Sequence, residues 1–236
     1  MRNYIIEKNN KMNNFYTSSG ISVYIKDPLT NGIDMEEIMQ FVENKIPSKF
    51  MTEVEMVIVG EIEEFRERQI NALYKDGCLY ITNIQENNED IVDDIIHEIS
   101  HSLEEPYGYE IYGDKKLEIE FLNKRRDLRN ILWNLGHKTQ ISFFLNIEYD
   151  REFDEFLLNT VGYDKLALLL QGIFITPYAA TSLREYFATG FTEFFMEPNH
   201  SLLKTVSPVL YSKVKQIYQD DWHFCSCVLT YKDTRR

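Results

Sequence analysis

Hydrophobic and polar positions repeat with two different periods along this chain. In the first part, short apolar runs bounded by turn residues predict strands over 1–6, 21–26, 54–59 and 78–82 and one helix over 35–44, which Asp34 can cap. Further along, apolar residues recur every three or four positions and predict helices over 89–105, 117–133, 143–158, 164–170, 183–196 and 201–218. We therefore expect an α+β fold, in which a small mixed sheet is followed by a mostly helical lobe.

The predicted helix over 89–105 has two clearly different faces. One face is apolar and must pack inward: Ile91, Val92, Ile95, Ile96, Ile99 and Leu103. The other face carries His97, Glu98 and His101, which we expect to point toward a cleft or solvent. Pro106 and Gly108 should end the helix.

These three residues form the sequence His-Glu-Ile-Ser-His, an H-E-x-x-H motif. On a helix it places two imidazoles one turn apart on one face, where both can bind one Zn²⁺ ion. The glutamate between them, Glu98, then lies beside the water on the metal and can act as a general base. A catalytic zinc site needs a third protein ligand, so the motif alone is incomplete.

The third ligand has several candidates. Glu104 and Tyr107 occupy the glycine and histidine positions of the longer H-E-x-x-H-x-x-G-x-x-H motif, which excludes that class. His137, His200 and His223 are isolated and fit surface or capping histidines. Glu185, near the start of the helix over 183–196, fits a ligand and fits equally well the glutamate of a capping box that begins at Ser182. Glu193, on the same face, is a reserve candidate.

A second segment, residues 178–191, resembles the active-site segment of the anthrax lethal factor family of zinc endopeptidases, which includes the clostridial Pro-Pro endopeptidases. The matching positions are Tyr178, Glu185, Tyr186, Phe187, Ala188 and Phe191. The resemblance implies a zincin-like fold, one catalytic Zn²⁺ on His97, His101 and Glu185, and an active-site tyrosine at Tyr178. It covers two short segments, about 78–105 and 176–196. The family usually has a second glutamate where this chain has Thr189.

The resemblance predicts an endopeptidase in which Glu98 activates the water and Tyr178 stabilises the oxyanion. Two alternatives remain: a zinc amidase that acts on cell wall or a small amide, and a zincin-like module that only binds protein. We expect the strand over 79–82 to be an edge strand of the sheet, along which the substrate peptide lies extended; an ordinary edge strand with no substrate role is the alternative.

Two other groups of residues give weaker indications of function. His223, Cys225 and Cys227 suggest a second metal site, although a strand with free thiols explains them more simply. The basic group of Lys124, Arg125, Arg126 and Arg129 is most simply a solvated helix face or a set of salt-bridge partners.

Composition narrows the class of protein. The 236 residues carry a net charge of −13, so nucleic acid and anionic membranes are not expected partners. The start of the chain lacks the apolar stretch of a secretory signal, and three cysteines do not make a disulfide framework. We expect an intracellular protein, although one released by lysis or by a dedicated export machine would look the same. With no obvious linker, residues 1–236 are expected to form one catalytic unit, with an α/β lobe over 1–110 and a mainly helical lobe over 111–236.

Overall fold

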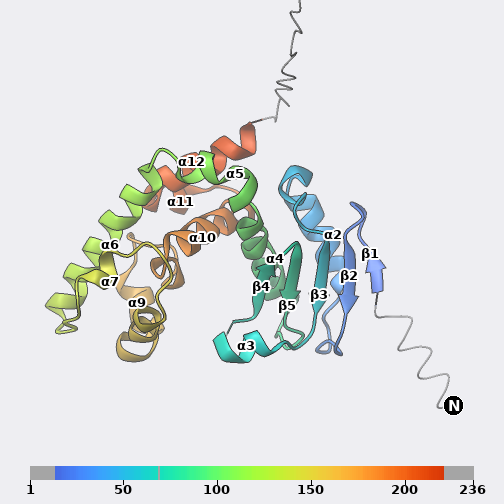
Figure 1. Cartoon of the computed structure of the whole chain (residues 1–236), viewed down its shortest axis with the longest axis horizontal. Helices are drawn as coiled ribbons and strands as arrows, with labels where there is room; N and C mark the ends of the chain where they lie inside the picture. Colours follow the sequence, from blue (N-terminus) through green and yellow to red (C-terminus); the bar gives the residue numbers. More distant parts are fainter. Residues whose placement is uncertain (1–13, 69, 221–236) are drawn as a thin grey trace, which may run out of the picture.

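Five short strands form one mixed sheet (Figure 1). The computed structural model describes residues 14–68 and 70–220, and the expected strand over 1–6 lies outside that range. The strands are β1 (Asn14–Tyr16), β2 (Ser22–Ile25), β3 (Met56–Val59), β4 (Ala72–Lys75) and β5 (Cys78–Ile81), and their order in the sheet is β1-β2-β3-β5-β4. The three central strands are parallel, whereas β1 and β4 run antiparallel at the two edges. The expected α+β class with a small mixed sheet is confirmed.

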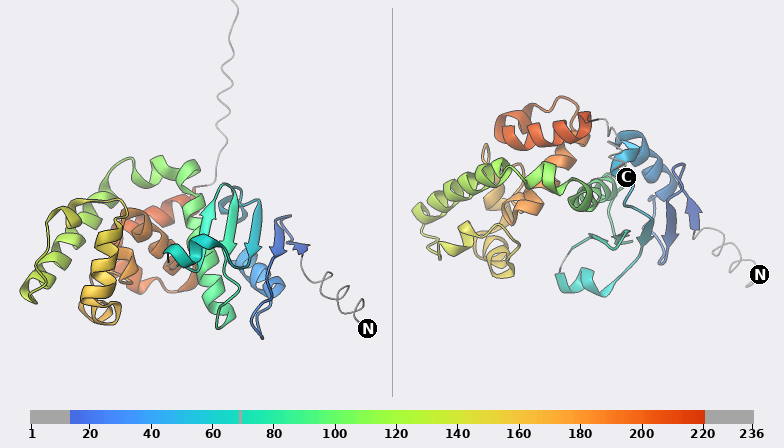
Figure 2. Two further views of the ribbon diagram at one scale, coloured as in Figure 1. Left: turned by 60° about the horizontal axis from the view of Figure 1, so that its bottom comes forward. Right: turned by 45° about the horizontal axis from the view of Figure 1, so that its top comes forward.

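One face of the sheet carries the core. Val57, Val59, Leu79 and Ile81 are fully buried, while the residues between them are only half-buried, as the two-residue period of a strand requires. Two helices, α2 (Met35–Lys45) and α4 (Asn88–Ser102), cover the buried face (Figure 2). Asp34 caps α2 as expected, because its carboxylate accepts hydrogen bonds from the backbone of Glu36 and Glu37.

The edge of the sheet differs from the expectation. β5, which includes most of the segment 79–82, pairs with β3 on one side and β4 on the other, so it is an interior strand. The edge strand is β4, which follows the short helix α3 (Glu63–Arg68). Asp76 and Gly77 form the turn between β4 and β5, both with positive φ, which is typical of tight hairpins. β4 has the sequence Ala-Leu-Tyr-Lys, with no β-branched residue and no alternation of buried and exposed positions, so the sequence alone did not indicate it.

The helix that carries the H-E-x-x-H motif ends earlier than expected. α4 ends at Ser102, and α5 (Glu104–Tyr112) begins two residues later. Pro106 and Gly108 lie inside α5, so the prediction that they end the motif helix is wrong. Pro106 is the third residue of α5, in the first turn, where a backbone N–H has no helical partner to lose. The hydroxyls of Ser100 and Ser102 donate to the carbonyls of His97 and Ile99 near the end of α4, a bond that bends helices.

The second half of the chain is helical. Its elements are α6 (Lys116–Asn134), α7 (Ser142–Leu145), α8 (Arg151–Glu155), the π-helical turn η2 (Phe156–Val161), α9 (Tyr163–Leu169), the 3-10 turn η3 (Tyr178–Ala180), α10 (Leu183–Met196), α11 (Ser201–Val206) and α12 (Pro208–Gln219). The prediction for 183–196 matches α10 residue for residue. The single helix expected over 201–218 is instead two helices, because Pro208 has no backbone N–H and starts a new one. The helix expected over 143–158 is likewise divided among α7, α8 and η2.

The sheet half and the helical half meet where α10 packs along α4 (Figure 1). Phe50, in the 3-10 turn η1 (Ser48–Phe50), packs edge-on against Phe191 and Phe195 of α10, which joins the two halves in one core. Among the described helices, none has both the length and the apolar character needed to cross a bilayer.

The basic group on α6 is only partly solvated. Arg126 is exposed, but Lys124 and Arg125 are buried and donate to backbone carbonyl oxygens: Lys124 to Ile173 and Val206, Arg125 to Phe143 and Thr181. The expectation of a solvated face or of salt bridges is therefore wrong for these two side chains. They connect α6 to four other segments of the helical half.

Candidate metal centre

The polar face of α4 lines a cleft of about 620 Å³ between the two halves of the molecule. His97, Glu98 and His101 all reach this cleft, and their ligand atoms lie within 4.8 Å of one another. Glu98 and His101 are only 8% and 7% exposed. The apolar face of α4 packs against the sheet and α2, which turns the motif toward the cleft as the periodicity predicted.

The start of α10 brings Glu185 to the same point. Ser182 caps this helix, since its hydroxyl accepts a hydrogen bond from the Glu185 backbone N–H at 3.1 Å. The Glu185 side chain, however, turns to α4. Its Oε2 lies 2.8 Å from His97 Nε2 and 3.5 Å from His101 Nε2. Serine capping is thus present, but the glutamate side chain contacts the histidines.

These three atoms fit the ligand set of a catalytic zinc ion. Two imidazole nitrogens and one carboxylate oxygen are donors that Zn²⁺ accepts, at bond lengths of about 2.0–2.1 Å. Ligands in a tetrahedron with such bonds are separated by about 3.3 Å. The separations of 2.8 and 3.5 Å from Glu185 Oε2 to the two histidines lie on either side of that value. His97, His101 and Glu185 could therefore hold such an ion.

The carboxylates and the imidazoles at this site shift one another's pKa values. Burial opposes ionisation of Glu185, but hydrogen bonds from His101 and His97 outweigh it and hold the carboxyl pKa well below its usual range. Burial likewise disfavours the charged form of His101, but the carboxylates of Glu104 and Glu185 outweigh it and raise the pKa of this imidazole to about 9. A cation at this point is therefore favoured by the surrounding carboxylates.

Glu98 is held by the backbone of the edge strand. Its Oε2 accepts a hydrogen bond from the Tyr74 N–H at 2.6 Å. Thr82 N–H donates to Asn71 O, so residues 71, 73 and 75 direct their backbone groups to β5. The alternate residues Ala72 and Tyr74 direct theirs outward, to the cleft. The N–H that orients Glu98 thus belongs to the free side of the edge strand.

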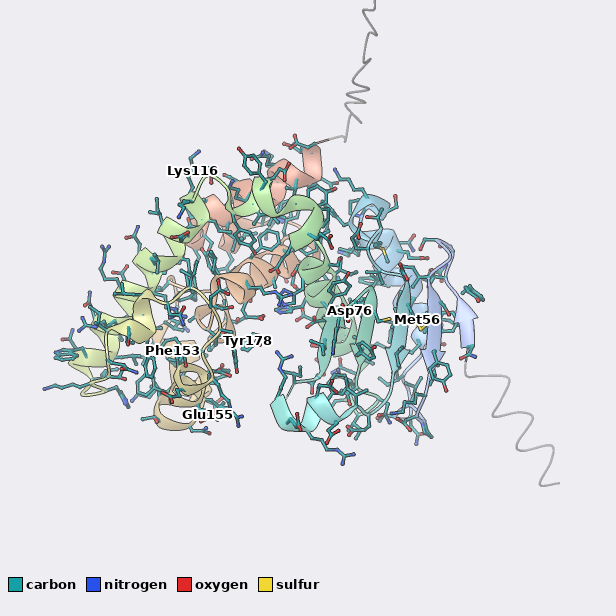
Figure 3. All side chains as sticks on the ribbon, viewed as in Figure 1. Met56, Asp76, Lys116, Phe153, Glu155 and Tyr178 are labelled. Carbon is teal, nitrogen blue, oxygen red and sulfur yellow. The ribbon has the colours of Figure 1, made fainter. Side chains whose placement is uncertain are left out.

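Tyr178 faces the motif histidines from the helical half. It lies on η3, and its ring centroid is 6.2 Å from that of His97 (Figure 3). Burial, with a contribution from Glu185, raises its pKa above the usual range, so the hydroxyl stays protonated and able to donate. The structure therefore brings all five predicted site residues to one cleft: His97, Glu98, His101, Tyr178 and Glu185.

The other predicted candidates lie farther along the cleft or outside it. Glu193 and Thr189 line the cleft further along α10. His137 lies beside Lys165, and His200 stacks on Phe194 with ring centroids 4.4 Å apart, just before α11. The possible second metal site at His223, Cys225 and Cys227 is outside the described residues.

Sequence reasoning did not identify Tyr74, Glu104 or Arg184 as site residues. Tyr74 acts through its backbone, which no side-chain pattern reveals. Glu104 follows His101 by three residues, a spacing at which helical neighbours meet, and this was the available signal. Arg184 donates to Glu104 at 2.9 Å and lines the cleft next to Glu185.

Comparisons of the chain with known protein families, with curated proteins and with solved structures found no match.

Proposed function

We propose that this protein is a zinc-dependent endopeptidase with a zincin-like fold. The observation that carries the proposal is the position of Glu185. Its carboxylate reaches both histidines of the motif across the contact between α4 and α10, although it is 84 residues beyond His101 in the sequence (185 − 101). A largely buried carboxylate and two histidines at one point in a cleft suit a three-ligand catalytic zinc.

Zinc supplies Lewis-acid chemistry: it lowers the pKa of a bound water and polarises the carbonyl of the peptide bond. Glu98 is the group that takes the proton of the attacking water and passes it to the leaving nitrogen. The Tyr74 N–H holds one carboxylate oxygen of Glu98, which leaves the other free for the proton. Tyr178 keeps its hydroxyl proton and donates a hydrogen bond to the developing oxyanion.

The substrate would lie along β4 rather than β5. Ala72 directs its N–H and C=O toward the cleft, where an extended peptide can add to the sheet by backbone hydrogen bonds. Tyr74 uses its outward N–H on Glu98, so it offers the peptide only its carbonyl. This arrangement supports a peptide substrate more directly than a small amide, which has no extended backbone to pair.

Metal content and cleavage, measured together, test the proposal. We expect the purified protein to bind one Zn²⁺ and to cleave peptides, and Glu185→Ala to lose both. A zinc-binding protein that cleaves small amides or cell-wall fragments but no peptide is an amidase. One that binds zinc and hydrolyses nothing is a binding module. Either result refutes the proposed function, and so does a Glu185→Ala variant that binds zinc as tightly as the wild type.

A further inference from the structure

The second ring nitrogen of His101 has no hydrogen-bond partner among the described residues, although it is completely buried. Nε2 of this imidazole faces Glu185, and Nδ1 points the other way. The nearest carboxylate oxygen to Nδ1 is Glu104 Oε1, at 3.9 Å. An imidazole N–H buried without an acceptor is costly, and a metal-bound histidine usually donates this N–H to a carboxylate or carbonyl.

Glu104 is held near His101 by two other groups. Arg184 Nε donates to Glu104 Oε1 at 2.9 Å, and the Tyr112 hydroxyl lies 3.4 Å from the same oxygen. Glu104 is the first residue of α5, directly after the break that ends the motif helix. Arg184 precedes Glu185 on α10. The pair Glu104–Arg184 therefore connects the end of the motif helix to the helix that supplies the third ligand.

We propose that Glu104 is a positioning residue for His101. Its carboxylate accepts a hydrogen bond from Nδ1–H, which fixes the tautomer with a free lone pair on Nε2 and keeps that nitrogen directed at the metal position. Arg184 holds Glu104 in place and so couples the orientation of His101 to the position of Glu185. The proposal rests on the metal centre of the proposed function, but it does not depend on peptide cleavage.

An ordinary surface ion pair would behave differently. Glu104 and Arg184 are 29% and 49% exposed, and exposed pairs add little to folding stability. If that were their only role, removal of the Glu104 charge would change neither zinc affinity nor the geometry at the metal. Zinc affinity is therefore the readout that separates the two roles.

The test measures Zn²⁺ affinity of the full chain by competition with a chromophoric chelator, without any substrate. We expect Glu104→Gln to bind Zn²⁺ about 10–100-fold more weakly than the wild type. Glu105→Gln, the same change one residue further on an exposed position, should stay within about 3-fold. Arg184→Gln should weaken binding in the same direction as Glu104→Gln, but less. Thermal unfolding of the zinc-free proteins checks that each variant folds.

A second readout follows the geometry itself. With Co²⁺ in place of zinc, the visible absorption bands report the ligand field, and we expect them to shift in Glu104→Gln but not in Glu105→Gln. The proposal is overturned if Glu104→Gln binds Zn²⁺ as tightly as Glu105→Gln and has the same Co²⁺ spectrum. Failure of the proposed function looks different: the wild type binds zinc, Glu104→Gln binds it more weakly, and no peptide is cleaved.

Discussion

The polar atoms of the charged side chains on α6 and of those in the cleft find their partners in opposite ways. On α6, the hydrogen bonds of Lys124 and Arg125 go to backbone carbonyl oxygens of four different segments. At the candidate metal centre, by contrast, His97, His101 and Glu185 direct their side-chain nitrogen and oxygen atoms at one another. The α6 charges hold the chain together, whereas those in the cleft converge on a point that a cation can fill.

The two regions are nevertheless connected. Arg125 donates to the carbonyl of Thr181, which directly precedes the Ser182 cap of α10. Its guanidinium also stacks on the rings of Phe121 and Phe153, at 4.9 and 4.3 Å from their centroids. Tyr178 and Glu185 lie within four residues of Thr181. We infer that the buried arginine supports the segment that completes the site.

The largest expected change in this comparison concerns Arg125. Substitution Arg125→Met leaves two buried carbonyl oxygens without their donors, at about 1–3 kcal/mol each, so the free energy of unfolding should fall by about 2–6 kcal/mol. Arg126→Met, a change at the exposed neighbour, should alter it by less than about 0.5 kcal/mol. Urea denaturation of the zinc-free proteins measures both. Equal stability of the two variants would show that the buried arginine is not a support.

In contrast to Arg125→Met, Tyr178→Phe should lower the cleavage rate and leave the stability unchanged. Loss of one oxyanion donor typically lowers the rate by about 10²–10³-fold, while zinc content and unfolding temperature should stay close to those of the wild type. Tyr149→Phe, which removes a hydroxyl bonded to Asp154, is the matched control and should change the rate by less than about 3-fold. Steady-state cleavage of one peptide measures the effect. A Tyr178→Phe variant as active as this control would remove Tyr178 from the mechanism.

Tyr74→Pro tests the backbone donor to Glu98. Proline removes the outward N–H but no hydrogen bond to β5, so an edge strand can accommodate it. A hydrogen bond to a charged group contributes about 1.5–3 kcal/mol, so we expect the cleavage rate to fall about 10–100-fold with zinc still bound. Tyr74→Ala keeps the N–H and loses only the ring and its bond to Glu53. If it is as slow as Tyr74→Pro, the N–H does not position Glu98.

The smallest expected effect depends on pH. Burial raises the pKa of Asp94, beside the motif on α4, from 3.8 to about 6. Folding therefore favours its neutral form, so its charge destabilises the fold fully above about pH 6 and not at all below about pH 4. Asp94→Asn should raise the free energy of unfolding by about 1–3 kcal/mol at pH 8 and leave it unchanged at pH 3.5. Urea denaturation at the two values checks this, and an equal difference at both would contradict it.

The sequence predicted the features that depend on side-chain type and spacing. The two periods indicated an α+β fold, and Ser182 with the apolar positions of 183–196 located α10. The H-E-x-x-H motif located three members of the site, and the resemblance selected Glu185 and Tyr178. Spacing alone could not decide whether Glu185 caps α10 or binds a metal, because that choice depends on where α10 packs.

The remaining features depend on backbone groups. The edge strand β4 has no β-branched residue and no alternating burial, and its role at Glu98 comes from a backbone N–H. In the sequence, Lys124 and Arg125 look like solvated residues. Their partners are backbone carbonyl oxygens, which every residue has, so no side-chain pattern reveals that they are buried. Pro106 can follow one helix or lie in the first turn of the next, and only packing decides.

The most direct test of the central claim is the cleavage of a proteome-derived peptide library, read by mass spectrometry. With Zn²⁺ bound, the wild type should produce defined new peptide ends, and the reaction should stop when a chelator removes the metal. Glu98→Gln should bind zinc equally well and cleave at least about 10²-fold more slowly, because it cannot take up the proton. Cleavage by Glu98→Gln at the wild-type rate, or no cleavage by the zinc-loaded wild type, would contradict the account.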